Sequence, residues 1–146
     1  MNKVFYLFCI SFCFLTLESC SDSHHNLSYF KSHMDEIESL DSDTIITIQD
    51  GKIMLSKEEG ESGDYINFHL QYYKNNKLQY YKRVSKFFNS ICYDGVLVES
   101  EEYEVKGTQI NLKNRIIKDE NGNNVDSTGC QFPYKLPFKL TYTLNE

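Results

Sequence analysis

The feature that most constrains the fold is a hairpin of alternating apolar and polar residues in the first half of the chain. Residues 44–49 (TIITIQ) and 52–57 (KIMLSK) flank the dipeptide Asp50-Gly51. A period of two is typical of a strand that buries one face, and Asp-Gly favours the type I′ turn of a two-residue hairpin. We therefore expect two antiparallel strands in which Ile46 faces Leu55.

Short segments of the same kind continue to the end of the chain, separated by turns rich in Asn, Asp and Gly. They cover residues 65–74, 77–86, 91–93, 96–98, 101–106, 108–113 and 132–144. The chain has no alanine, the best helix former, but it has 11 tyrosines and 10 phenylalanines, which favour strands. The pattern predicts an all-β fold, an antiparallel meander of about eight strands arranged as a barrel or a sandwich.

One short helix is expected before the strands. Apolar residues recur at steps of three and four from position 27 to position 40, which is the spacing of an amphipathic helix. We expect residues 28–40 to form this helix and to pack on the sheet. A chain of 146 residues has the usual size of one domain, so residues 27–146 are expected to form a single β domain.

Residues 1–19 have the layout of a secretory signal peptide. Lys3 precedes an apolar stretch at residues 4–17, whereas a helix needs about 20 apolar residues to cross a membrane. The sequence Leu17-Glu18-Ser19-Cys20 resembles the lipobox of bacterial lipoproteins. The resemblance implies cleavage before Cys20, acylation of that cysteine, and a lipidated tether at residues 20–26.

The same resemblance implies where the protein resides. More than one acyl chain gives stable anchoring, so we expect attachment to a membrane of the cell envelope through Cys20. Ser21, rather than an aspartate, follows this cysteine. By resemblance to other lipoproteins, that choice favours the outer membrane, facing the periplasm or the cell surface.

Cysteine usage predicts one disulfide. Cys9 and Cys13 leave with the signal peptide and Cys20 is acylated, which leaves Cys92 and Cys130 as a pair. An oxidising compartment favours a bond between them, which would stabilise the fold by about 4 kcal/mol. Two free buried thiols are the alternative.

No motif predicts catalysis or metal binding. The sequence lacks GxSxG, HExxH, a P-loop and GxGxxG, so we expect no enzyme activity, cofactor or metal site. His69 lies mid-strand and is expected to be a surface or hydrogen-bonded structural histidine. The glutamates at positions 99, 101, 102 and 104 are expected on a solvated strand face.

A basic stripe runs along residues 74–86, interleaved with tyrosines. Its members are Lys74, Lys77, Lys82, Arg83 and Lys86. The net charge of −6 and the envelope location argue against a nucleic-acid partner. A solvated strand face is the simplest interpretation, and a docking surface is the alternative.

The meander with its N-terminal helix is weakly similar to the lipocalin-like small lipoproteins of bacteria, and YEVKGTQINL at residues 103–112 resembles their late hairpin. Those domains usually begin with a Gly-x-Trp strand, and this chain has no Trp. The resemblance to lipocalin-like domains implies the first functional hypothesis, a binding module that holds a small apolar ligand inside a barrel. The predicted cavity residues are Phe68, Leu70, Tyr72, Tyr103 and Tyr142.

The second hypothesis is a protein–protein interaction role. The chain would be an accessory of an envelope complex, or an inhibitor or immunity protein against a secreted enzyme or toxin. This hypothesis predicts a filled core and an exposed patch around Tyr73, Tyr80 and the basic stripe. The sequence identifies neither the ligand nor the protein partner.

Overall fold

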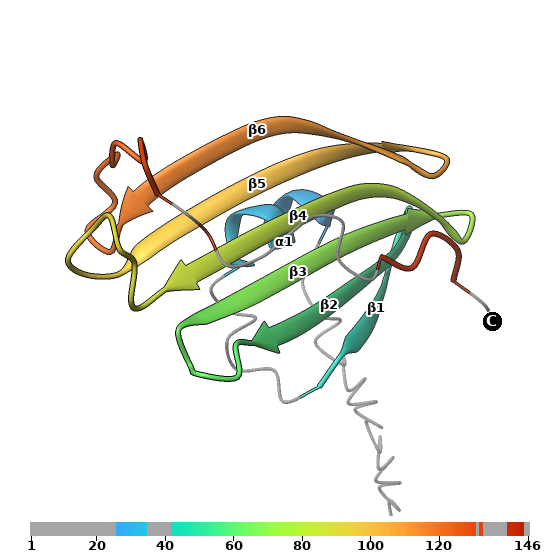
Figure 1. Ribbon diagram of the computed structural model, residues 1–146. Helices are drawn as coiled ribbons and strands as arrows, with labels where there is room; N and C mark the ends of the chain where they lie inside the picture. Colours follow the sequence, from blue (N-terminus) through green and yellow to red (C-terminus); the bar gives the residue numbers. More distant parts are fainter. Residues whose placement is uncertain (1–25, 35–41, 131, 133–139, 145–146) are drawn as a thin grey trace, which may run out of the picture.

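The structure, a computed structural model, describes residues 26–34, 42–130, 132 and 140–144 (Figure 1). The predicted signal peptide, Cys20 and residues 21–25 of the predicted tether lie outside these described residues. Within the described part, no helix has the length and apolar character that a membrane crossing requires.

The fold is mostly antiparallel β structure with one short helix. Six strands pair in chain order into a single meander sheet that is not closed, with the first and last strands at its edges (Figure 1). The elements are α1 (Leu27–Ser32), β1 (Thr44–Ile48), β2 (Gly51–Glu59), β3 (Tyr65–Lys74), β4 (Lys77–Phe87), β5 (Leu97–Lys106) and β6 (Gln109–Asp119). The described residues therefore form one open sheet of six strands, and the prediction of about eight in a barrel or sandwich is wrong.

The strand count differs for identifiable reasons. β5 joins the predicted segments 96–98 and 101–106, because Glu99 between them is held by two arginines inside the fold rather than exposed on a solvated strand face. Residues 91–93 belong to the connection between β4 and β5. Of the predicted last strand, residues 133–139 lie outside the described residues, and Thr143 forms only an isolated bridge.

The first hairpin forms with a different turn from the one predicted. Ile46 pairs with Ile53 rather than with Leu55, and Gly51 lies within β2. A Cβ atom on Gly51 would lie 2.1 Å from the backbone oxygen of Tyr73 on β3. Glycine is thus required here by the close approach of a neighbouring strand, while the apolar residues keep the face predicted for them.

The second hairpin agrees with the sequence. β3 covers the predicted residues 65–74, and β4 extends the prediction by one residue. Asn75 and Asn76 have φ angles of 51° and 57°. Positive φ at both central residues is the requirement of a type I′ turn, which asparagine tolerates.

α1 covers one face of the sheet, which we call the helix face. The side chain of Asn26 caps the helix by accepting a hydrogen bond from the backbone N–H of Tyr29 at 3.0 Å. The helix ends at Ser32 rather than at residue 40 as predicted, because His33 leaves helical geometry, and residues 35–40 are not described. The buried apolar residues shared by helix and sheet are Phe30, Met34, Ile53, Leu55, Phe68 and Leu70.

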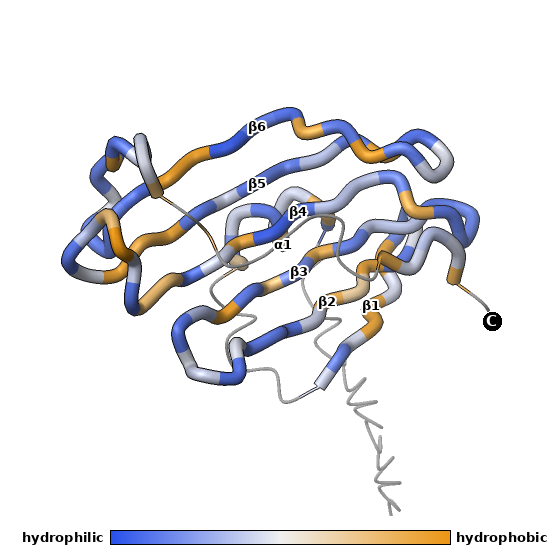
Figure 2. Tube along the Cα trace, viewed as in Figure 1, coloured by the Kyte–Doolittle hydropathy of each residue, from blue (hydrophilic) through white to orange (hydrophobic). Residues whose placement is uncertain are grey.

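The opposite face carries two smaller apolar clusters. One contains Tyr73, Leu78, Tyr81, Tyr103 and Val105, and the other contains Phe87, Leu97 and Ile117. Leu140, Tyr142 and Leu144 pack against the first cluster, and the backbone N–H of Leu78 donates to the carbonyl of Tyr142 at 2.9 Å. Figure 2 shows hydrophilic stretches in the middle of β5 and β6, with hydrophobic residues towards their ends.

Candidate functional site

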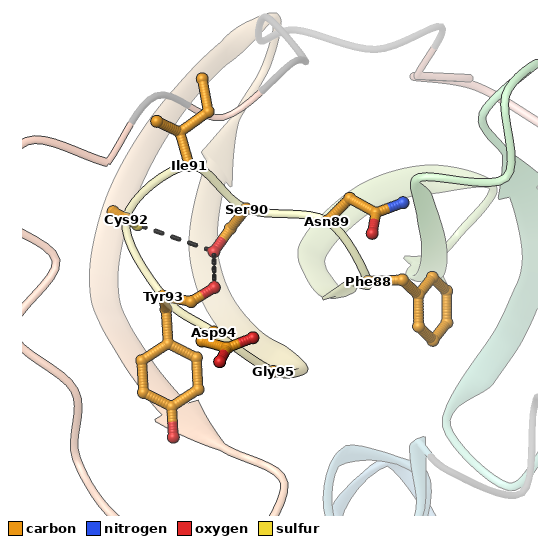
Figure 3. Close-up of a pocket in the computed structure, with 8 residues that line it drawn as sticks. All are labelled: Phe88, Asn89, Ser90, Ile91, Cys92, Tyr93, Asp94 and Gly95. Atoms are coloured by element: carbon orange, nitrogen blue, oxygen red, sulfur yellow. Dashed lines mark hydrogen bonds between the residues drawn. The ribbon is translucent and has the colours of Figure 1, made fainter.

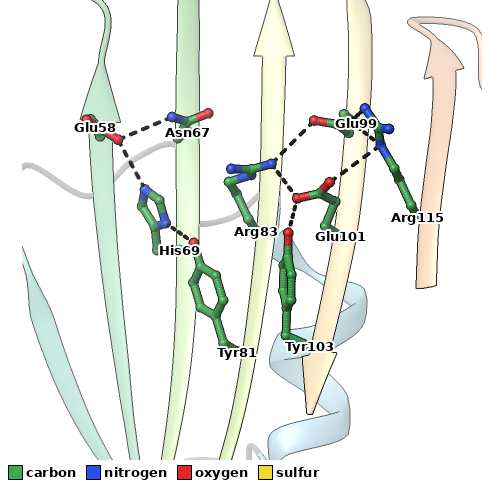
Figure 4. A network of polar contacts seen from close by, with 9 residues as sticks. All are labelled: Glu58, Asn67, His69, Tyr81, Arg83, Glu99, Glu101, Tyr103 and Arg115. Atoms are coloured by element: carbon green, nitrogen blue, oxygen red, sulfur yellow. Dashed lines mark hydrogen bonds and ion pairs between the residues drawn. The ribbon is translucent and has the colours of Figure 1, made fainter. Parts of the chain in front are cut away.

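A buried network of charges lies on the opposite face, across β4, β5 and β6 (Figure 4). The Nη2 atom of Arg83 donates to Glu101 and lies 3.5 Å from Oε2 of Glu99. Arg115 reaches the same carboxylates, with its Nε atom 2.6 Å from Oε1 of Glu99 and 3.4 Å from Oε1 of Glu101. Arg83 is 1% exposed, Glu99 0% and Glu101 5%. Two arginines therefore face two carboxylates that are almost fully buried, while the side chain of Arg115 is itself partly exposed.

Opposing effects act on the pKa of Glu99. Burial raises the pKa of Glu99, and the adjacent carboxylate of Glu101 raises it further. The hydrogen bond and positive charge of Arg115, together with the charge of Arg83, oppose that rise. The two arginines thus offset the cost of burying the carboxylates.

The network continues through aromatic rings towards β2. Tyr103 donates its hydroxyl proton to Glu101, and its ring stacks on Tyr81 with ring centroids 5.3 Å apart. The hydroxyl of Tyr81 lies 2.8 Å from Nδ1 of His69, whose Nε2 lies 3.6 Å from Oε2 of Glu58. His69 is therefore a hydrogen-bonded structural histidine, one of the two roles expected from the sequence.

Burial keeps His69 neutral. It lowers the pKa of His69 to about 4, and the charge of Arg83 acts in the same direction, while Glu58 opposes both. A neutral ring with its proton on Nε2 fits the contacts, because Nδ1 then accepts the hydroxyl proton of Tyr81.

We expect the protein to lose stability as the pH falls below about 6.5. Because the pKa of His69 is about 4 in the fold, against its ordinary 6.5, the unfolded chain binds a proton that the folded chain excludes. The loss should reach about 2 kcal/mol at pH 5 relative to pH 7. Urea unfolding followed by circular dichroism at both pH values measures it. His69→Gln should lose this part of the pH dependence, and an unchanged pH dependence in that variant would contradict the assignment.

A second feature is the connection between β4 and β5, residues 88–95, which we call the β4–β5 loop. The backbone N–H of Phe88 donates to the carbonyl of Asp64 at 2.9 Å, and Nδ2 of Asn89 donates to the carboxylate of Asp64 at 3.0 Å. The hydroxyl of Ser90 donates to the carbonyl of Tyr93 at 3.0 Å, and these two residues form a β-bridge. Both halves of the loop are thus held by specific hydrogen bonds.

A disulfide fixes the middle of the β4–β5 loop. Cys92 is bonded to Cys130, 38 residues further along, which confirms the predicted pair. Both cysteines and Tyr93 pack against the cluster of Phe87, Leu97 and Ile117. Gly95 closes the loop at a φ of 132°, where a Cβ atom would lie 3.2 Å from the ring of Tyr93. The loop is therefore a covalently anchored part of the fold.

The outer side of the same loop is apolar and exposed. Ile91 is 95% exposed and Phe88 is 39% exposed. The eight loop residues line an open hollow of about 480 Å³. In Figure 3 the loop curves round this hollow, with the Phe88 ring and the Asp94 carboxylate across it from one another. Such an arrangement offers an apolar contact beside a concave, partly acidic site.

The five residues predicted to line a ligand cavity fall on two faces of the sheet. Phe68 and Leu70 are buried on the helix face, and Tyr72 packs against their cluster. Tyr103 and Tyr142 lie on the opposite face. The open sheet thus separates the two groups, and the prediction that one barrel interior gathers them has no counterpart in this arrangement.

The predicted basic stripe is divided in the same way. Arg83 is buried in the charge network, whereas Lys82 lies on the helix face, 3.8 Å from Glu102. Tyr73, expected in an exposed patch, is 1% exposed and donates its hydroxyl proton to the carbonyl of Thr141 at 2.7 Å. The solvated face expected for the stripe is therefore wrong for Arg83, and the exposed patch expected of a protein-binding surface is wrong for Tyr73.

Sequence reasoning missed both the charge network and the loop. Glu99 and Glu101 were expected on a solvated face, and they are buried because the pairing of β5 with β4 and β6 brings arginines beside them. The loop was expected to contain a strand at residues 91–93. One feature of the sequence could have indicated an exposed loop here. A single isoleucine stands between Ser90 and Cys92, in a segment too short to show the apolar–polar alternation of a strand.

Comparisons with family models, curated proteins and solved structures found no match. Among the residues that the structure describes, no group of three or more His, Cys, Asp and Glu side chains is placed to hold a metal ion. The candidate site is therefore defined by its own geometry, and the β4–β5 loop is the feature that most resembles a binding surface.

Proposed function

We propose that this chain is a lipid-anchored protein of the bacterial cell envelope that binds another protein through its β4–β5 loop. The observation that carries the proposal is the near-complete exposure of Ile91 on a loop fixed by the Cys92–Cys130 disulfide. The lipid anchor rests on the lipobox-like sequence that ends at Cys20. The partner would be a component of an envelope complex, or a secreted enzyme or toxin that the chain inhibits.

Physical reasoning favours a binding role for such a loop. A partner that covers Ile91 would bury a large aliphatic side chain, which is worth about 1.5–3 kcal/mol. Ordering a flexible loop on binding normally offsets part of such a gain. Here the disulfide and the hydrogen bonds to Asp64 order the loop beforehand, so most of the gain is available for affinity.

The small-ligand hypothesis receives less support from the same structure. Phe30 and Met34 of the N-terminal segment already occupy the apolar surface around Phe68 and Leu70. The middle of the opposite face holds buried charges rather than an apolar lining. These features support the protein-binding hypothesis, and the open sheet of the described residues lacks the barrel interior that the small-ligand hypothesis requires.

Site-specific photo-crosslinking tests the proposal. The full chain would carry p-benzoylphenylalanine in place of Ile91 and be expressed in cells of its own host. We expect one discrete cross-linked protein from position 91, because that side chain would contact the partner directly. The matched control is the same substitution at Leu112, which is 51% exposed on β6.

Two outcomes would contradict the proposal. Absence of any adduct from position 91 would remove the loop as a binding surface, and an adduct from position 112 alone would place the surface on β6. The anchor is tested in the same cells with Cys20→Ala. That variant should leave the membrane fraction, and unchanged membrane attachment would contradict the lipoprotein assignment.

A further inference from the structure

We propose that the β4–β5 loop recognises a basic segment of its partner, with an arginine or lysine side chain entering the hollow between Phe88 and Asp94 while Ile91 contacts apolar surface beside it. This inference rests on the proposed function and specifies the chemistry of the partner. Three observations carry it: the exposed apolar tip, the hollow, and the charge around them.

Carboxylates surround the loop at both of its ends. Asp64 accepts a hydrogen bond from Asn89 at the start of the loop. Near its end, Asp94, Asp119 and Glu120 are all close enough to Tyr93 to raise its pKa, the effect of burial being the largest cause of that rise. Four carboxylates thus lie near the two ends of the loop, and Asp94 among them lines the hollow.

These carboxylates differ from those of β5 in how they are satisfied. Asp64 accepts hydrogen bonds from the neutral side chains of Ser62 and Asn89, and Asp119 accepts from the side-chain amide of Asn123 and from the backbone N–H groups of Asn123 and Asn121. These hydrogen bonds lower the pKa of Asp64 and of Asp119, so both stay ionised at neutral pH.

No cation neutralises this group within the described part of the chain. The salt bridges found there use the acids of β2 and β5, such as Glu99, Glu101, Glu102 and Glu104, and involve none of the four carboxylates around the loop. Among the described residues, the negative charge at the loop therefore has no cationic counterpart, and a partner can complement it. A basic protein surface does so, whereas an anionic lipid surface would be repelled.

The lining of the hollow suits a basic side chain. Phe88 supplies an aromatic ring, and Asp94 supplies a carboxylate across the hollow from it (Figure 3). A cation over an aromatic ring and beside a carboxylate gains from both contacts, and guanidinium suits such sites because it is planar and weakly hydrated. The volume of about 480 Å³ lies within the range of about 300–1,000 Å³ found for small-ligand pockets.

The first test uses n-butylguanidinium, which represents an arginine side chain, as a probe of the purified chain. We expect saturable chemical-shift changes in the amide signals of residues 89–95 at millimolar concentrations, and none with butyrate. Asp94→Asn should weaken this binding at least severalfold. Binding that is unchanged by Asp94→Asn, or absent in the parent chain, would overturn the assignment of the hollow.

The second test separates this inference from the proposed function. Asp94→Lys and Glu120→Lys would each be combined with the photo-crosslinker at position 91. We expect each to lower the adduct yield at least tenfold, while the matched control Asp50→Lys, an exposed acid at the β1–β2 turn, leaves the yield unchanged. Circular dichroism melting would confirm that all three variants fold.

The outcomes are distinguishable. An adduct that survives both charge reversals would overturn the basic partner and leave the proposed function standing. An adduct lost equally in Asp50→Lys would show that net charge rather than the loop decides binding, and would overturn the local site. The lack of any adduct in the parent chain would remove the proposed function itself.

Discussion

Replacing Arg83 by methionine is expected to lower the free energy of unfolding by about 3–5 kcal/mol. Arg83 is 1% exposed and lies between Glu99 and Glu101, which are almost equally buried. Methionine fills much of the same volume but provides no charge or donor. Glu101 would then keep only its longer contact with Arg115 and its hydrogen bond from Tyr103.

Urea unfolding followed by circular dichroism would measure this loss. The matched control is Arg115→Met. It should cost less, because the side chain of Arg115 is 43% exposed and water already screens its ion pairs with the glutamates. Adding Glu99→Gln and Glu101→Gln to Arg83→Met should recover part of the stability, since uncharged amides are cheaper to bury without a partner. If Arg83→Met fails to fold, Arg83→Lys provides a milder test. A loss below about 1 kcal/mol would contradict the structural role of the network.

Removing the disulfide is expected to cost about 4 kcal/mol. Cys92 and Cys130 are 38 residues apart, and a bond across such a loop restricts the unfolded chain more than the folded one. The double variant Cys92→Ser/Cys130→Ser tests this by urea unfolding. It should also speed hydrogen exchange at residues 88–95, because the loop would keep only its hydrogen bonds.

Ile91→Ser is the control for that experiment. Its side chain is 95% exposed, so the free energy of unfolding should change by less than about 0.5 kcal/mol. A large loss in Ile91→Ser would mean that the isoleucine is part of the core. Equal stability of the double serine variant and the parent chain would remove the disulfide as an anchor of the loop.

Local chemistry set several parts of this structure, and these were predictable. Alternation in residues 65–74 predicted β3, and the Asn75-Asn76 turn follows from the tolerance of asparagine for positive φ. The pairing of Cys92 with Cys130 followed from counting the cysteines that lie beyond the predicted signal peptide and lipobox. In each case the deciding residues are neighbours in sequence, or no competing partner exists.

Tertiary contacts decided the remainder. Gly51 was expected in a turn, and its place in β2 depends on the approach of Tyr73 from another strand. The predicted barrel would have required β1 to meet β6, and no local pattern encodes the closure of a sheet.

The charge network and the β4–β5 loop show the same limit most clearly. Alternation placed Arg83, Glu99 and Glu101 on strands, but it could not say which strands would be neighbours. Their burial is favourable only because β4, β5 and β6 align guanidinium groups with carboxylates. The sequence alone therefore determined the β character, the Asn75-Asn76 turn and the disulfide. The tertiary structure decided which charges are buried beside an opposite charge. It also decided that the carboxylates near the β4–β5 loop have no cationic counterpart among the described residues. The physical reason is that charge pairing between strands depends on their register.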